Sequence, residues 1–360
     1  APVAANPEVL VARQSGNDTA TVGDGASREQ AIAAWLSSLG LAAATLEAAS
    51  EDASFRRYLR VTPGGAAWPY PKHDSLIVMD APPPQEDCRP FLHVAQGLAA
   101  LGLPVPEILA DDVEQGFLLL SDLGSQALLP QLEAAPELAD ALYAQAGDWL
   151  HQLQPRGAEF ADTLPPYDEA LLRREMALFS DWLCAKHLGL EWDADDQREW
   201  SQLTDRLVAN ALQQPQTAVH RDYHSRNLML DADLGLWIID FQDAVRGGFT
   251  YDLVSLLRDC YIEWPIEQVT DWAVRWFDDA PMAATQSQAQ NLRWFFLSGV
   301  QRQLKAAGIF ARLGHRDGKW HFLEDVPRTL GYITQLSGSY PELDWLIDLI
   351  ETRCLPALSQ

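Results

Sequence analysis

Hydrophobic and polar positions follow two different patterns along the chain, and the change falls near residue 121. Before it, short segments that either alternate between apolar and polar residues or are apolar throughout are interspersed with single amphipathic segments, a pattern typical of strands mixed with helices. In chain order, this part predicts a helix from Ser27, strands at 54–61 and 75–80, a helix at 91–101 and a strand at 116–120.

The first of these helices has a start, a face and an end in the sequence. Ser27 followed by Gln30 forms a capping-box pattern, and Gly40 ends the segment. The apolar residues at helical spacing between them are Ile32, Trp35, Leu36 and Leu39. Residues 1–27 are small and polar and lack the basic and apolar regions of a signal peptide, so we expect a loose N-terminal arm.

After residue 121 the apolar period becomes helical. Long amphipathic helices are predicted at 136–154, 167–188 and 196–212, and further helices from Tyr251 to the end. The two patterns together predict an α+β fold, with a small β-rich lobe at 28–121 and a large, mainly helical lobe at 122–360.

A polar loop interrupts the helical region. It reads His220-Arg221-Asp222-Tyr223-His224-Ser225-Arg226-Asn227, and Asp240-Phe241 follows thirteen residues later. Apolar segments at 218–219, 228–230 and 236–239 flank this loop, which predicts a hairpin that brings the loop and Asp240 side by side. An H-x-D triplet alone is more often an ordinary polar loop, but the full spacing is much harder to reach by chance.

This spacing supplies what phosphoryl transfer from a nucleoside triphosphate requires. Asp222 is predicted to be the catalytic base that receives the proton of the attacking hydroxyl. Asn227 and Asp240 are predicted ligands of Mg²⁺, because an amide oxygen and a carboxylate are hard oxygen ligands of the kind this ion takes. The sequence therefore predicts a phosphotransferase that uses ATP and Mg²⁺.

Composition narrows the possible partners and the compartment. A chain of 360 residues, 48% of them hydrophobic, is long enough for two domains. The formal net charge of −25 argues against nucleic acid or an anionic membrane surface as a partner. No apolar run is long enough to span a membrane, and the four cysteines include no C-x-x-C pair. We expect a cytoplasmic monomer that acts on a small molecule.

These motifs resemble the aminoglycoside phosphotransferase and choline kinase-like superfamily, which are small-molecule relatives of the protein kinases, over roughly residues 28–350. Within it, the chain resembles the bacterial anomeric sugar kinases of peptidoglycan recycling, which phosphorylate the 1-hydroxyl of N-acetylmuramate and N-acetylglucosamine. The segments that carry the resemblance are 52–60, 77–83, 220–229, 239–244, 251–259 and 308–313. The resemblance implies a two-lobed protein kinase-like fold and an ATP-dependent sugar 1-kinase.

The resemblance also implies where the nucleotide binds. Residues 52–55, with Ser54 and Phe55, would form the loop over the phosphates, and residues 118–124, including Asp122, would be the hinge that reads adenine. Ile77 and Leu120 would supply apolar walls. The related kinases keep a phosphate-binding Lys on the third strand, where this chain has Met79. Arg57 and Arg60 are the candidates to replace that charge, and the alternative is that both are solvated.

Substrate residues are predicted around the loop and on later helices. Tyr223 and Arg226 flank the base, and His220 would brace the loop. Asp252 is either a helix cap or a second brace, and we favour the brace.

Arg258 and Asp259 could face the substrate or form a solvated pair. The late helix carries Gln301, Arg302 and Lys305, a group that either forms a charged outer face or supplies a cation near substrate. For muramate, Arg258 or Arg302 could bind the lactyl carboxylate.

Two alternatives stay open. One is a kinase of another small alcohol, such as an aminoglycoside, choline or homoserine. The acidic charge would suit a cationic substrate, whereas the Arg residues of the candidate pocket would not. The other is a nucleotide-binding pseudokinase, which the Met at position 79 suggests and the presence of Asp222, Asn227 and Asp240 opposes.

Overall fold

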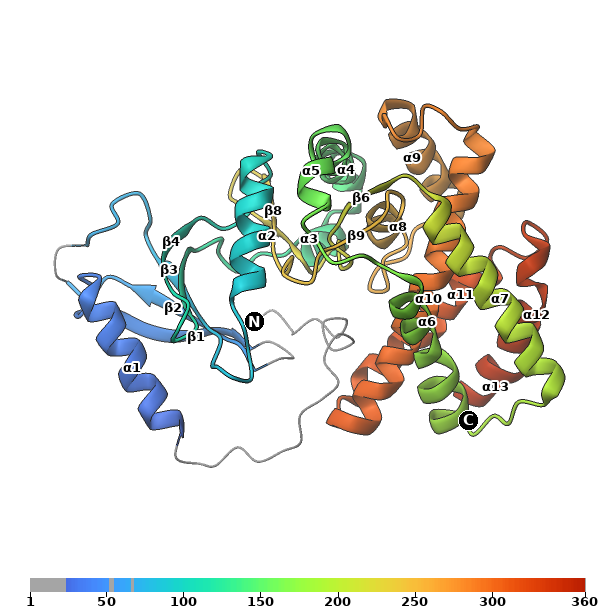
Figure 1. The fold of residues 1–360 in the computed structure, drawn as a ribbon, viewed down its shortest axis with the longest axis horizontal. Helices are drawn as coiled ribbons and strands as arrows, with labels where there is room; N and C mark the ends of the chain where they lie inside the picture. Colours follow the sequence, from blue (N-terminus) through green and yellow to red (C-terminus); the bar gives the residue numbers. More distant parts are fainter. Residues whose placement is uncertain (1–23, 52–54, 66–67, 360) are drawn as a thin grey trace. The chain divides into compact units, whose positions relative to one another are not determined.

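The computed structural model describes residues 24–51, 55–65 and 68–359 and forms two compact units (Figure 1). The first comprises Ala1–Ala127 with Met229–Gln242, and the second comprises Leu128–Leu228 with Asp243–Gln360. The sequence placed the boundary at 121/122 and kept the whole hairpin in the helical part. In the structure the chain first passes from the first unit to the second between Ala127 and Leu128, six residues later, and most of the hairpin belongs to the first unit.

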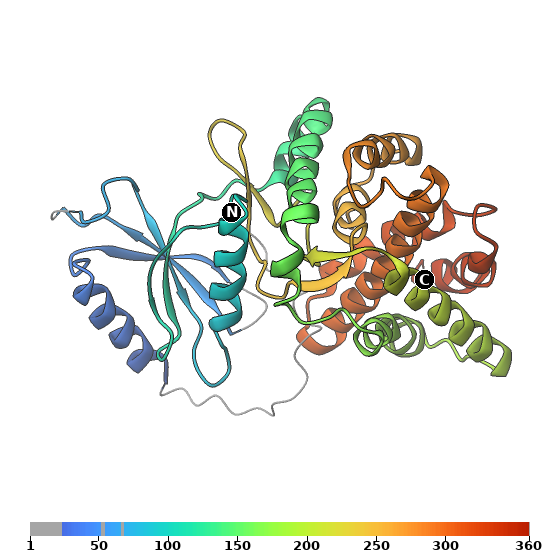
Figure 2. The ribbon, with the colours of Figure 1, turned by 45° about the horizontal axis from the view of Figure 1, so that its top comes forward.

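The first unit contains a five-stranded antiparallel sheet in the order β1-β2-β3-β5-β4. Figure 2 shows the helices α1 and α2 on either side of it. The bounds are α1 Asp24–Ser38, β1 Thr45–Glu51, β2 Arg57–Thr62, β3 Leu76–Asp80, α2 Arg89–Ala100, β4 Ile108–Asp112 and β5 Phe117–Ser121. Helix α1 begins three residues before the predicted Ser27, and residues 1–23 of the expected arm lie outside the described residues.

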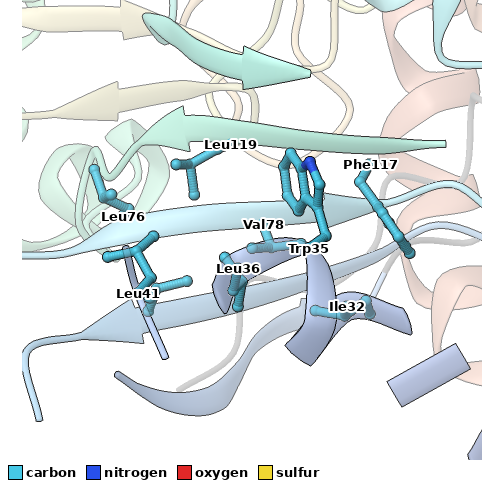
Figure 3. Close-up of a cluster of buried hydrophobic side chains, with 9 residues drawn as sticks. Ile32, Trp35, Leu36, Leu41, Leu76, Val78, Phe117 and Leu119 are labelled. Carbon is cyan, nitrogen blue, oxygen red and sulfur yellow. The ribbon is translucent and has the colours of Figure 1, made fainter. Parts of the chain in front are cut away.

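Alternation along the strands gives this sheet one face that packs on α1 (Figure 3). The strands and the α1 segment together form one hydrophobic cluster. The strands contribute Val61, Leu76, Val78, Phe117 and Leu119, and α1 and the residues after it contribute Ile32, Trp35, Leu36 and Leu41. Trp35 and Phe117 bring their ring centroids to 5.4 Å. Burial of each large side chain stabilises the fold by about 1.5–3 kcal/mol, and the predicted helix face is confirmed.

The second unit is mainly helical. Its longer helices are α4 Ala139–Arg156, α6 Glu169–Leu178, α7 Ala194–Gln213, α9 Ile266–Asp279 and α10 Gln288–Asp317, and a π-helix, Phe179–His187, continues α6. Shorter helices are α3 Leu128–Ala134, α5 Ala158–Ala161, α8 Tyr251–Leu257, α11 Val326–Thr334, α12 Asp344–Leu349 and α13 Leu355–Leu358. The three long helices predicted before the loop are confirmed within about three residues. Among the described residues, no helix is both long and apolar enough to cross a membrane.

Two short strand pairs surround the polar loop. Strands β6 (Gln216–Val219) and β9 (Val245–Gly248) pair antiparallel within the second unit. Strands β7 (Leu228–Leu230) and β8 (Leu236–Ile238) form the predicted hairpin, with a turn at 231–235. The loop therefore leaves β6 and enters the hairpin directly.

Helix α10 runs through the middle of the second unit and packs closely on α6 and the π-helix (Figures 1 and 2). Gly308 lies directly against this neighbour, because a Cβ atom there would lie 2.2 Å from the carbonyl carbon of Leu178. No side chain can give way at that point, since the neighbouring atoms are backbone. The glycine therefore sets the separation of the two helices.

Substituting Gly308→Ala should destabilise the protein by about 1–3 kcal/mol, the cost of overpacking a dense interior. Gly331→Ala is the matched control, because it lies inside α11 with nothing within 4 Å of the added Cβ. Alanine there should stabilise the helix by about 0.5–1 kcal/mol. Urea unfolding of the two variants measures both changes, and a shift of the same sign would contradict the close-packing account.

Candidate active site

The polar loop is held at its beginning by Asp252, in the first turn of α8. The Asp252 carboxylate accepts the backbone N–H of His220 at 2.7 Å and that of Arg221 at 3.0 Å. Burial raises the pKa of Asp252 to about 6, although these hydrogen bonds act in the opposite direction. Asp252 makes the bracing contacts that we favoured over a helix cap.

Asp259 holds the loop near its other end. Its carboxylate accepts the N–H and the hydroxyl of Ser225, and also the N–H of Tyr261 at 2.9 Å. Its neighbour Arg258 turns to a different partner, α11, and donates to the carbonyl oxygen of Tyr332 at 2.8 Å. Both residues are buried. These contacts give both side chains structural partners and argue against the substrate contacts predicted for them.

Asp222 and Asn227 are joined through the loop backbone. The amide nitrogen of Asn227 donates to the carbonyl oxygen of Asp222 at 2.9 Å, and the Asp222 N–H donates to Nδ1 of His220 at 3.2 Å. Because the side-chain nitrogen of Asn227 points to the carbonyl oxygen of Asp222, the side-chain oxygen of Asn227 points away from that carbonyl. Asn227 thus offers the hard oxygen that Mg²⁺ requires.

Arg221 precedes the proposed base in a left-handed conformation, with φ of 77°. This region is costly for a residue with a side chain and persists only where the surroundings fix it. The Arg221 guanidinium is buried and pairs with Glu175 of α6. The Glu175 carboxylate also accepts the hydroxyl of Tyr167. Glu175 therefore fixes the loop next to Asp222, a role that the sequence did not predict.

A buried lysine approaches Asp222 from α10. The Nζ atom of Lys305 lies 3.6 Å from Oδ1 of Asp222, and the lysine side chain is 0% exposed. Gln301 and Arg302 are also buried, so this face of α10 points inward and is not the charged outer face that was one alternative. Burial would raise the pKa of Glu175, yet the charges of Lys305 and Arg221 hold it below its usual value.

The other predicted substrate residues have protein partners of their own. The buried hydroxyl of Tyr223 donates to the carbonyl oxygen of Ala146 at 2.8 Å, which argues against substrate contact. A nitrogen of Arg302 lies 3.2 Å from the sulfur of Cys260. The guanidinium of Arg226 stacks 3.6 Å above the ring of Tyr261. Arg226 is only half-buried, so it alone of the three reaches the surface of the second unit.

The two arginines proposed for the phosphates are paired within the first unit. Arg57 binds the buried carboxylate of Asp80 at 2.6 Å, on the α1 face of the sheet. Arg60, on the other face, binds Asp122 at 2.6 Å, and this hydrogen bond raises the pKa of Arg60. Asp122 also accepts the hydroxyl of Ser75 at 2.7 Å. Both arginines therefore have an anionic partner within the first unit, while their side chains keep 40% and 29% of their exposure to solvent.

Two of the remaining residues predicted to bind the nucleotide, Ile77 and Leu120, share the sheet face of Arg60. Ile77 pairs with Leu120 across β3 and β5, and alternation puts both opposite the α1 face, beside the buried Met79. Phe55 is 64% exposed, and its N–H donates to Glu86 at 3.2 Å. Ser54 and the rest of the predicted phosphate loop at 52–54 lie outside the described residues.

Asp240 belongs to the first unit and follows β8. It too is left-handed, with φ of 61°, and its Oδ1 accepts the amide of Gln242 at 2.7 Å. The next residue, Phe241, is buried against Phe91 of α2 with ring centroids 4.8 Å apart. Packing of Phe241 therefore fixes the backbone that presents the Asp240 carboxylate, a hard oxygen donor suited to Mg²⁺.

A five-stranded sheet unit, a helical unit and an H-R-D-x-x-x-x-N loop with a hairpin-borne Asp define the class of small-molecule kinases with a protein kinase-like fold. The model of the phosphotransferase enzyme family matches residues 45–285, and the chain belongs to this family. The predicted fold and the predicted enzyme class are confirmed.

Relatives with assigned activities are close in sequence. The N-acetylmuramate/N-acetylglucosamine kinase of Pseudomonas aeruginosa is 47% identical over 310 residues, which cover 85% of this chain and 88% of that protein. The kinase of the same name from Neisseria meningitidis is 39% identical over 307 residues, covering 84% and 88%.

Solved structures confirm the fold at lower identity. A choline/ethanolamine kinase family protein from Mesorhizobium loti has a TM-score of 0.58 and 16% identity, covering 92% of this chain and 99% of that one. The GDP complex of wild-type aminoglycoside 2'-phosphotransferase-IIIa has a TM-score of 0.57 and 15% identity, covering 84% and 98%.

Proposed function

We propose that this protein transfers the γ-phosphoryl group of ATP to the anomeric hydroxyl of N-acetylmuramate and N-acetylglucosamine, as a step of peptidoglycan recycling. The observation that carries the proposal is the identity of 47% with a kinase of these two sugars over 85% of the chain. The loop supports the same chemistry, because two buried carboxylates hold it at His220 and at Ser225.

The proposed roles follow from the donor atoms. Asp222 accepts the proton of the anomeric hydroxyl as that oxygen attacks the phosphorus. Asn227 and Asp240 would hold Mg²⁺, which when bound neutralises charge on the phosphates. Ile77 and Leu120 would contact the adenine ring through their apolar surface. Ser54 and Phe55 remain the proposed contacts of the phosphate loop.

The test is a panel of acceptors assayed by ADP release. We expect turnover with N-acetylmuramate and N-acetylglucosamine and none with aminoglycosides or choline. Phosphorus NMR of the product should show coupling to H1, and the phosphate should be released in mild acid. An acid-stable product, or turnover with aminoglycosides or choline alone, would point to a kinase of another alcohol. Mg-ATP binding without turnover of any acceptor would point to a pseudokinase.

Asp240→Ala should weaken the Mg²⁺ dependence of ATP binding, since the variant lacks a proposed metal ligand. Calorimetric titration of ATP at several Mg²⁺ concentrations measures this. Asp233→Ala is the control, because it removes an exposed carboxylate from the turn of the same hairpin. If both variants titrate like the unmodified protein, Asp240 is not a metal ligand.

We also propose a cytoplasmic location and a monomer. All four cysteines lie among the described residues, where they are buried and none forms a disulfide, which agrees with a reducing compartment. Light scattering at micromolar concentration tests the monomer, and a mass near twice 40.0 kDa would contradict it.

A further inference from the structure

The feature that the proposed mechanism leaves unused is the ammonium group of Lys305. A lysine is rarely buried completely, because the charged form loses its hydration unless other charges compensate. Lys305 is 0% exposed and lies 3.6 Å from Oδ1 of Asp222. This buried cation thus lies in ion-pair range of the side chain proposed as the catalytic base.

Helix packing fixes where that cation lies. Gly308 follows Lys305 by one turn of α10, and Leu178 follows Glu175 by one turn of α6. His187, further along the π-helix that continues α6, lies 3.2 Å from His315 of α10, so the two helices run in the same direction. The contact between Gly308 and the backbone of Leu178 therefore aligns the two preceding turns and places Lys305 toward Glu175. This agrees with the effect of Lys305 on Glu175. Burial would raise the pKa of Glu175, but the neighbouring charges of Lys305 and Arg221 lower it.

Four charges then form one buried group, with Arg221 and Lys305 as the cations and Glu175 and Asp222 as the anions. Arg221 pairs with Glu175, and Lys305 approaches the side chain of Asp222. A distance of 3.6 Å is longer than a good hydrogen bond but within the range of an ion pair, and attraction between charges is strong in a buried setting.

We propose that Lys305 is a positioning residue for Asp222, whose carboxylate it holds in the direction needed to receive the acceptor proton. The inference rests on the proposed function, because it takes Asp222 as the base. It assigns to α10 a part in the reaction that differs from binding the sugar carboxylate. Lys305 acts through Asp222, so replacing Lys305 should lower kcat only in a protein that retains the Asp222 carboxylate.

The test is a double-mutant cycle between Lys305 and Asp222. Lys305→Met keeps a side chain of similar length and removes the charge. We expect kcat to fall roughly tenfold to a hundredfold, as for other losses of catalytic geometry. The KM for sugar and the Kd for Mg-ATP should stay within about twofold, because Lys305 contacts neither ligand in this proposal.

In the Asp222→Asn background, Lys305→Met should lower the residual kcat no further, because the carboxylate it orients is gone. Leu297→Ala is the packing control: it removes a buried side chain from the same helix and should change stability but not kcat. An equal loss in both backgrounds, or no loss in the native background, would overturn the positioning role. Native turnover of Asp222→Asn would instead overturn the proposed function.

If Lys305→Met does not fold, the cycle is repeated with Lys305→Gln, which also removes the charge but keeps a polar side chain at the buried position. The comparison of the native protein with Lys305→Gln, with and without Asp222→Asn, gives the same coupling. The positioning role requires that the loss of kcat disappear once Asp222 is replaced.

Discussion

Replacing Asp222 with Asn should lower kcat by roughly a hundredfold or more, the usual consequence of losing a general base. The asparagine is nearly isosteric, so the loop and its braces at Asp252 and Asp259 should keep their geometry. Mg-ATP binding should be nearly unchanged, because the carboxylate acts on the sugar hydroxyl and not on the nucleotide. Single-turnover assays and ATP titration measure the two quantities.

Asp233→Asn, an exposed residue of the hairpin turn, is the matched control and should turn over normally. Turnover of Asp222→Asn close to the native rate would remove Asp222 from the mechanism. A loss of ATP binding in that variant would show instead that Asp222 supports the nucleotide or the loop.

Local patterns could be predicted well from the sequence. The apolar stripe of α1 and the alternation of β2 depend on neighbours a few residues away, so periodicity suffices to find them. The loop from His220 to Asn227 is equally local. The grouping of residues 229–242 with the first unit depends on packing with distant segments, as in the contact of Phe241 with Phe91, and no local pattern reports it.

The predicted substrate residues show the same limit more sharply. Arg258 and Asp259 are adjacent in sequence, yet one bonds to Tyr332 and the other to Ser225. Two adjacent charges read as a pair in sequence, but the chain turns between them where α8 ends at Leu257. Only the tertiary fold decides which partner each one meets.

The sequence did contain one sign that Glu175 has a special role, because it places a charged residue at a position of the helix where apolar residues are expected. Leu172 and Met176 lie on the buried face of α6, and Glu175 falls at the same helical spacing. A carboxylate at such a position needs a buried cation, and Lys305 and Arg221 are the partners. The sequence shows the misplaced charge, whereas the partner lies 46 residues away in one case and 130 in the other.

Replacing Glu175 with Gln should destabilise the protein by about 3–5 kcal/mol, because it leaves Arg221 and Lys305 buried with one carboxylate between them. Glu169→Gln is the matched control: it lies on the same helix and pairs with Arg173 at 2.8 Å, but both side chains are well exposed. An exposed pair contributes about 0–1 kcal/mol. Free energies of unfolding in urea compare the two, and equal losses would mean that the buried pair behaves like a surface one. Because Glu175 also fixes the left-handed Arg221 beside Asp222, kcat of the folded variant should fall as well, while kcat of Glu169→Gln should not.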